Sequence, residues 1–129
     1  MDRLVALHAN LLFTILAVLG VLAIWGLAGA WRARLPGNLY LSCLAIGELL
    51  LVSEALIGVA LFVAGLRPAR PELHIVYAVV AVAALPVAHR YVRDRPPRQR
   101  WLTYALTCVF LCAVVLRGVE TGSAEALMG

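Results

Sequence analysis

The sequence is poor in charge. Only 14% of the 129 residues are Asp, Glu, Lys or Arg, whereas 64% are apolar, and the mean hydropathy is +0.94. A soluble domain has about a quarter charged residues and about half apolar ones. This composition excludes an ordinary soluble enzyme, a disordered chain and a disulfide-rich secreted scaffold, and it indicates an integral membrane protein.

Lysine is absent, and all 11 basic residues are Arg. These arginines lie between apolar segments, as in the loops of membrane proteins, so the formal charge of +4 does not predict a nucleic-acid partner. The three cysteines lie inside apolar segments and indicate no disulfide framework. A CxxCH haem attachment, HExxH, a Gly-rich phosphate loop and GxSxG are also missing, which excludes hydrolytic and phosphoryl-transfer enzymes.

Four apolar segments are long enough to cross a bilayer as helices. They run from about 4 to 31, 39 to 66, 73 to 91 and 101 to 119. The first is longer than the core of a signal peptide, so we expect a retained span. The connections are short and contain prolines, which makes successive helices antiparallel neighbours. The sequence therefore predicts one all-α domain over residues 1–129, an integral membrane four-helix bundle with up-down-up-down topology.

The arginines also predict an orientation. Seven lie at one end of the predicted bundle: Arg32, Arg34, Arg90, Arg93, Arg95, Arg98 and Arg100. Four lie at the other: Arg3, Arg67, Arg70 and Arg117. The positive-inside rule places the first end in the cytoplasm, so we expect a bacterial inner-membrane protein with both termini on the extracytoplasmic side. Trp31, Tyr40, Tyr91 and Trp101 are expected to form an aromatic belt at the cytoplasmic boundary.

Two histidines are the strongest candidates for a functional site. His8 lies about one turn into the first helix, and His74 opens the third. Both helices enter from the same side, so the two imidazoles should lie at similar depth, as the axial ligands of a haem iron require. A histidine at a membrane interface is also common without any ligand. His89, about 22 Å further along the third helix, has no partner at its depth on the first helix, so at most one bis-histidine haem is expected.

Glu48 and Glu54 are the most deeply placed charged residues. They are candidates for proton transfer or for a hydrogen bond to a cofactor or quinone; otherwise each is a neutral carboxyl bonded across the bundle. Gly47, Glu54, Gly58 and Gly65 fall near one stripe of the second helix, which is suited to close helix packing.

Arg117 is expected near the depth of the two histidines, where it could neutralise a haem propionate, pair with Glu120 or reach the lipid headgroups. Tyr77 lies one turn after His74 and could line the same site or pack in the core.

Leu7-His8, His74 and His89-Arg90 resemble small bacterial four-helix membrane proteins of the cytochrome b type, in which histidines of the first and third helices hold haem b. IGELLL, GLRPARPELH, Leu85-Pro86 and LRGVETG resemble uncharacterised four-helix proteins of thermophilic and phototrophic bacteria. The cytochrome resemblance implies a non-enzymatic haem b protein with His8 and His74 as iron ligands. It would exchange electrons with a quinone or a larger respiratory or photosynthetic complex.

Two other functions are compatible with the same residues. A cofactor-free structural or assembly subunit would use the glycine stripe to pack against partners and leave its histidines at the interface. A small proton-coupled transporter would use Glu54 as its coupling site.

Overall fold

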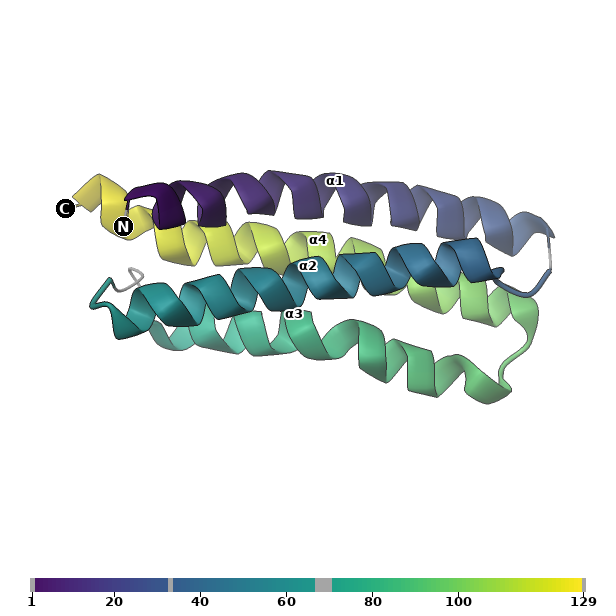
Figure 1. Cartoon of the computed structure of the whole chain (residues 1–129). Helices are drawn as coiled ribbons and strands as arrows, with labels where there is room; N and C mark the ends of the chain where they lie inside the picture. Colours follow the sequence, from purple (N-terminus) through teal and green to yellow (C-terminus); the bar gives the residue numbers. More distant parts are fainter. Residues whose placement is uncertain (1, 33, 67–70, 129) are drawn as a thin grey trace.

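The computed structural model describes residues 2–32, 34–66 and 71–128. Its elements are α1 (Asp2–Arg32), α2 (Asn38–Val63), α3 (Pro71–Tyr91), the 3-10 turn η1 (Val92–Asp94) and α4 (Pro97–Met128). The helices run antiparallel in chain order, so that Asp2 and Met128 lie at one end of the bundle (Figure 1). We call this end the terminal end. The structure confirms the predicted all-α bundle with up-down-up-down topology.

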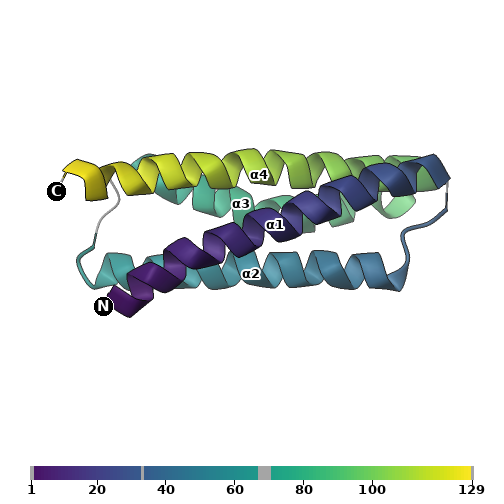
Figure 2. The same ribbon diagram turned by 90° about the horizontal axis from the view of Figure 1, so that it is seen from above.

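Each helix contacts the next one in the chain, and α1 also contacts α4. The pairs α1–α3 and α2–α4 are therefore diagonal, and a side chain of α1 can meet one of α3 only across the centre of the bundle. Seen from above, α1 crosses from α2 near its N-terminus to α4 near its C-terminus (Figure 2).

All four helices are long and apolar enough to cross a membrane. Large apolar side chains cover much of the outer surface, among them Phe13, Ile24 and Val63. Exposed apolar surface on this scale would drive aggregation in water but is compatible with lipid. The protein is therefore a multi-pass membrane protein, as its composition predicts.

The end of the second helix differs from the sequence-based prediction. The second helix stops at Val63 rather than continuing to Leu66, because Gly65 adopts a left-handed conformation with φ of +98° that other residues rarely adopt. The Gly65 and Leu66 amides then donate to the carbonyls of Phe62 and Leu61 at 3.1 and 3.0 Å, which closes the helix as a Schellman motif. Gly65 thus ends α2 and does not extend its packing stripe.

The fourth helix is longer than predicted at both ends. It begins at Pro97, a favourable first position because proline has no amide hydrogen to leave unpaired. It continues past residue 119 to Met128, where the apolar run has ended. The segment AEALM consists of strong helix formers, so the helix persists after the hydropathy falls.

Pro86 does not interrupt α3, which is one continuous helix from Pro71 to Tyr91. The C-terminal half of α3 leans away from α2 (Figure 1), and α2 and α3 form the least extensive of the four neighbouring helix pairs. Proline removes one amide donor and its ring crowds the preceding turn, which accounts for this change of direction.

The most extensive helix pair is α1–α4, and glycine allows it. A Cβ atom at Gly26 would lie 2.8 Å from the Tyr40 hydroxyl oxygen and 2.9 Å from the Ala105 Cβ. A Cβ at Gly29 would overlap the indole ring of Trp101. The two glycines therefore let the helices approach more closely than any larger residue would permit.

Aromatic side chains fill the interior beside this contact. The Tyr40 hydroxyl donates to the Leu22 carbonyl at 2.9 Å, and the Trp101 indole N–H donates to the Arg34 carbonyl. Tyr40 and Trp101 are only 1% and 7% exposed, so the prediction that they join an aromatic belt is wrong. They serve instead as polar-tipped core residues, whereas Trp31 and Tyr91 remain exposed as a belt requires.

Gly26→Ala and Gly29→Ala are expected to destabilise the bundle by about 1–3 kcal/mol, because the added methyl group must displace Tyr40, Ala105 or Trp101. Gly20→Ala is the matched control, since nothing lies within 4 Å of its Cβ position. Reversible unfolding in mixed micelles measures the difference. Equal stability of all three variants would show that the close approach is not needed.

Candidate functional site

The structure brings His8 and His74 together across the centre of the bundle. His8 lies on α1 and His74 in the first turn of α3, both toward the terminal end. Their ring centroids are 6.4 Å apart, and the ring planes are inclined by 58°. Because α1 and α3 are a diagonal pair, this approach is made through the interior of the bundle and not over its surface.

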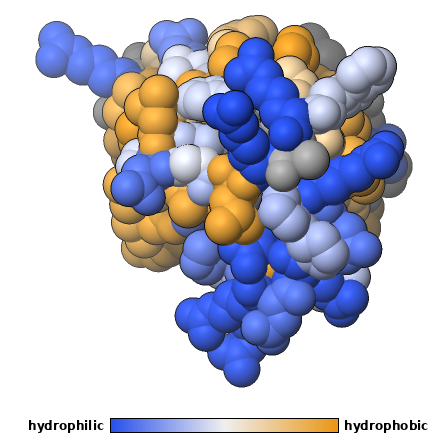
Figure 3. Space-filling model, turned by 90° about the vertical axis from the view of Figure 1, so that its right-hand side faces the viewer, coloured by the Kyte–Doolittle hydropathy of each residue, from blue (hydrophilic) through white to orange (hydrophobic). Residues whose placement is uncertain are grey.

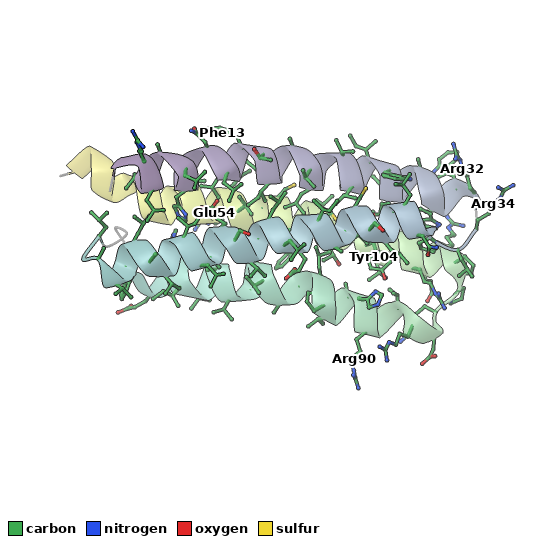
Figure 4. The ribbon with its side chains drawn as sticks, in the orientation of Figure 1. Phe13, Arg32, Arg34, Glu54, Arg90 and Tyr104 are labelled. Carbon is green, nitrogen blue, oxygen red and sulfur yellow. The ribbon has the colours of Figure 1, made fainter. Side chains whose placement is uncertain are left out.

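Glu54 of α2 is in direct contact with His8. The contact joins the Oε1 atom of Glu54 to the Nδ1 atom of His8. Glu54 is 7% exposed and lies between the helices (Figure 4). One turn later, a Cβ atom at Gly58 would lie 3.4 Å from His8 Cε1, so the absence of a side chain there leaves space for the imidazole ring. The α2 helix therefore holds His8 through one carboxyl group and one glycine.

Helix α4 holds the other histidine. His74 Nδ1 lies 3.1 Å from the carbonyl oxygen of Gly118. A carbonyl only accepts hydrogen bonds, so His74 Nδ1 carries the proton and donates it. Each of the four helices thus contributes one group to a cluster that we call the histidine site: His8, Glu54, His74 and the Gly118 carbonyl.

The Glu54 carboxyl also contributes an oxygen with no hydrogen bond. Its Oε2 atom is buried and has no hydrogen-bond partner in the part of the chain that the structure describes. Unpaired polar groups are costly in an apolar interior. The packing of the bundle therefore maintains a polar group that lipid alone would disfavour, which makes this cluster the leading candidate for a functional site.

The second carboxyl, Glu48, is separate from the histidine site. It lies six residues before Glu54, which places it about 9 Å from Glu54 along the helix axis and roughly 120° around the helix. Its Oε2 atom is likewise buried without a hydrogen bond among the described residues. Gly47 beside it faces α1, with its Cβ position 3.5 Å from Leu22. The stripe of Gly47, Glu54 and Gly58 therefore faces α1, as close packing requires.

The other candidate residues lie at varying distances from the site. Arg117 is exposed on α4 and directly precedes Gly118, so it lies near the histidines along the bundle axis. The side chain of Glu120, its expected partner, is outside the described part of the chain, as are Arg67 and Arg70. Tyr77 is half-buried and packs against the hydrophobic core, the second of its two expected roles.

His89 lies at the opposite end of the bundle. Its Nδ1 atom is 2.8 Å from the hydroxyl oxygen of Tyr104 on α4, and the two rings stack. The sequence gives no signal for this pair, because the spacing between residues of different helices carries no information on their contact.

The chain matches no protein-family model, no curated protein and no solved structure. Four-helix bundles serve many unrelated functions, so the architecture alone does not define what this one does. The chemistry of the histidine site is therefore the feature of the molecule that bears on its function.

That chemistry limits the ligands that the site can hold. Among the described residues, no group of three or more His, Cys, Asp or Glu side chains is arranged to hold a metal ion. A bare metal ion usually takes at least three protein ligands. A metal that is already held by a macrocycle needs only one or two axial ligands, and two facing imidazoles can supply these.

The polar contact of the histidine site is expected to contribute measurably to stability. In a double-mutant cycle, His8→Ala and Glu54→Ala are expected to couple by about 0.5–1.5 kcal/mol, the range of polar contacts between membrane helices. The cycle of His8→Ala with Glu48→Ala is the control and should be additive within about 0.3–0.5 kcal/mol. Unfolding in micelles measures both cycles, and equal coupling in the two would contradict the His8–Glu54 contact.

Proposed function

We propose that the protein binds haem b at the histidine site, with His8 and His74 as the two axial ligands, and that it transfers electrons as an accessory subunit of a larger membrane complex. The observation that carries the proposal is the approach of these two imidazoles from diagonal helices to a centroid separation of 6.4 Å. Two imidazole nitrogens that each lie about 2 Å from one metal bring the ring centres to roughly 6 Å from each other.

The contacts of the two rings also support the proposal. A metal-bound histidine commonly gives one ring N–H to a carboxylate or a backbone carbonyl, which orients the ring and makes the other nitrogen a better ligand. The Glu54 carboxyl contacts His8 at Nδ1, and the Gly118 carbonyl accepts from His74 at Nδ1. Each histidine therefore already has an oxygen partner at Nδ1 that would orient its ring, with Nε2 as the nitrogen that would bind the iron.

Each residue has a distinct task in this function. Bound haem would supply one-electron redox chemistry. His8 and His74 would ligate its iron, Glu54 and Gly118 would orient their rings, and Arg117 would neutralise a propionate. The surrounding apolar helices would keep water from the site, and the lower dielectric there would strengthen polar interactions such as the contact of Glu54 with His8.

The same proposal includes a location and an orientation. We place the protein in a bacterial inner membrane, with the seven-arginine end in the cytoplasm and the histidine site near the extracytoplasmic face. At that depth it would exchange electrons with a quinone or with a larger respiratory or photosynthetic complex.

Proton coupling is the second candidate function. It is favoured by the contact of Glu54 with His8 and by the buried Glu54 Oε2 atom, because an intramembrane carboxyl beside an imidazole can pass a proton. A cofactor-free structural or assembly subunit is the third candidate, and it has only the close helix packing in its favour.

A visible spectrum of the purified protein, oxidised and then reduced with dithionite, tests the haem proposal. We expect the sharp reduced α-band of a low-spin haem, and its loss in His8→Ala and in His74→Ala, because each variant removes one axial ligand. His89→Ala is the control, since His89 bonds to Tyr104 at the other end of the bundle. A protein that stays colourless after haem is supplied would exclude the proposal and leave proton coupling as the leading candidate.

Glu54 is expected to set the midpoint potential. Glu54→Gln replaces the carboxyl group that contacts His8 with an amide, a weaker hydrogen-bond acceptor, which makes the imidazole a weaker donor and destabilises ferric relative to ferrous iron. A rise of about 30–100 mV is expected, where roughly 59 mV corresponds to a tenfold change for one electron.

Redox titration of the variants measures this shift. Glu48→Gln is the matched control and should shift the potential less, because Glu48 lies about two turns from Glu54 along α2. Equal shifts in the two variants would mean that Glu54 acts only through its charge at a distance.

A further inference from the structure

A second polar site lies at the end of the bundle opposite the histidines, which we call the arginine end. A pocket of about 140 Å³ opens there between α2, α3 and α4. Leu41 and Val92 give it apolar walls, and its polar lining consists of His89, Arg93, Arg100 and Tyr104. The volume is about ten times that needed by one water molecule, so the pocket admits a small charged group.

The polar lining is held in place before any ligand binds. The Arg100 guanidinium donates from Nε to the Arg95 carbonyl at 2.8 Å and from Nη2 to the Arg93 carbonyl at 2.6 Å. A guanidinium has five N–H donors, so these two bonds orient Arg100 and leave three N–H groups for a ligand. The hydrogen bond of 2.8 Å between His89 and the buried Tyr104 fixes the opposite wall.

The charge at this end is unbalanced. Its arginines are Arg32, Arg34, Arg90, Arg93, Arg95, Arg98 and Arg100, and Asp94 is the one acidic residue of the two connecting segments. Among the described residues, no ion pair joins any of these seven arginines to a carboxylate. Hydrophilic side chains gather on this end of the bundle (Figure 3). An anion is therefore the ligand that the pocket favours.

The position of the pocket identifies the anion. Pro71–Asp94 and Pro97–Val119 are both membrane-spanning, and the pocket lies where the first span ends and the second begins. This is the depth of the lipid headgroups. The nearby exposed side chains of Leu39, Tyr91 and Leu106 are apolar, so they would contact acyl chains. Basic pockets between helices at this depth are suited to anionic lipid headgroups.

We propose that the pocket lined by His89, Arg93, Arg100 and Tyr104 binds the phosphate headgroup of an anionic phospholipid. The phosphate would accept hydrogen bonds from Arg100 and Arg93, as guanidinium groups and phosphates pair through parallel N–H···O bonds. The site does not depend on haem binding or on which side of the membrane the arginine end faces.

Lipid binding to the purified, delipidated full-length protein tests the proposal. Phosphatidylglycerol and phosphatidylcholine with the same acyl chains are added separately, and bound lipid is counted by native mass spectrometry while the midpoint of thermal unfolding is recorded. We expect retention of one phosphatidylglycerol and a higher midpoint, with at least about fivefold weaker retention of phosphatidylcholine, which carries no net charge.

Three variants locate the site. Arg93→Gln and Arg100→Gln are each expected to weaken phosphatidylglycerol retention at least about fivefold. Arg93→Gln keeps the test valid if loss of the Arg100 hydrogen bonds disturbs folding. Arg98→Gln is the matched control, because Arg98 is exposed near the same turn and does not line the pocket.

Other outcomes would overturn the proposal. Equal retention of the two lipids would mean that headgroup charge is not recognised. Equal loss in the Arg98 and Arg93 variants would mean that the whole basic surface attracts lipid without a defined site. Inorganic phosphate at millimolar concentration that raises the midpoint as much as phosphatidylglycerol would assign the pocket to a free anion.

Discussion

Within the hydrocarbon core of a bilayer, no water is available to hydrogen-bond a buried donor or acceptor, so a polar group there is costly unless it finds a partner inside the protein. Four helices satisfy their backbone groups internally. The side chains that remain polar are then forced to meet one another. The His8–Glu54 contact and the His74–Gly118 hydrogen bond both follow from this constraint, and they draw one group from each helix into the centre of the bundle.

Helix packing brings those groups within reach. Gly26 and Gly29 let α1 lie against α4, and Gly58 leaves space for the His8 ring against α2. A larger residue at position 58 would crowd the His8 ring, so this glycine and the polar site are directly linked.

The two ends of the bundle have different chemistry. One end holds a half-buried histidine pair beside a buried carboxyl, and the other presents an oriented arginine and a pocket at headgroup depth. The intervening core contains Leu19, Leu44, Leu111 and similar residues, which separate the polar sites by several apolar turns.

Sequence reasoning located the membrane spans because apolar length is a local property of the chain. It also placed His8 and His74 at one depth, since the alternation of helix direction fixes depth along the bundle axis. It did not find the Glu54 contact with His8, the pairing of His89 with Tyr104 or the burial of Tyr40. Each of these depends on how far a helix is rotated about its own axis.

The sequence by itself determined that this is a four-helix membrane bundle, with His8 and His74 toward one end and seven of the 11 arginines at the other, because hydropathy, helix length and charge are carried by consecutive residues. Only the tertiary structure decided which side chains meet, since rotation and separation of the helices are set by the close approach at Gly26, Gly29 and Gly58. Those contacts join residues far apart in the chain, and no local pattern encodes them.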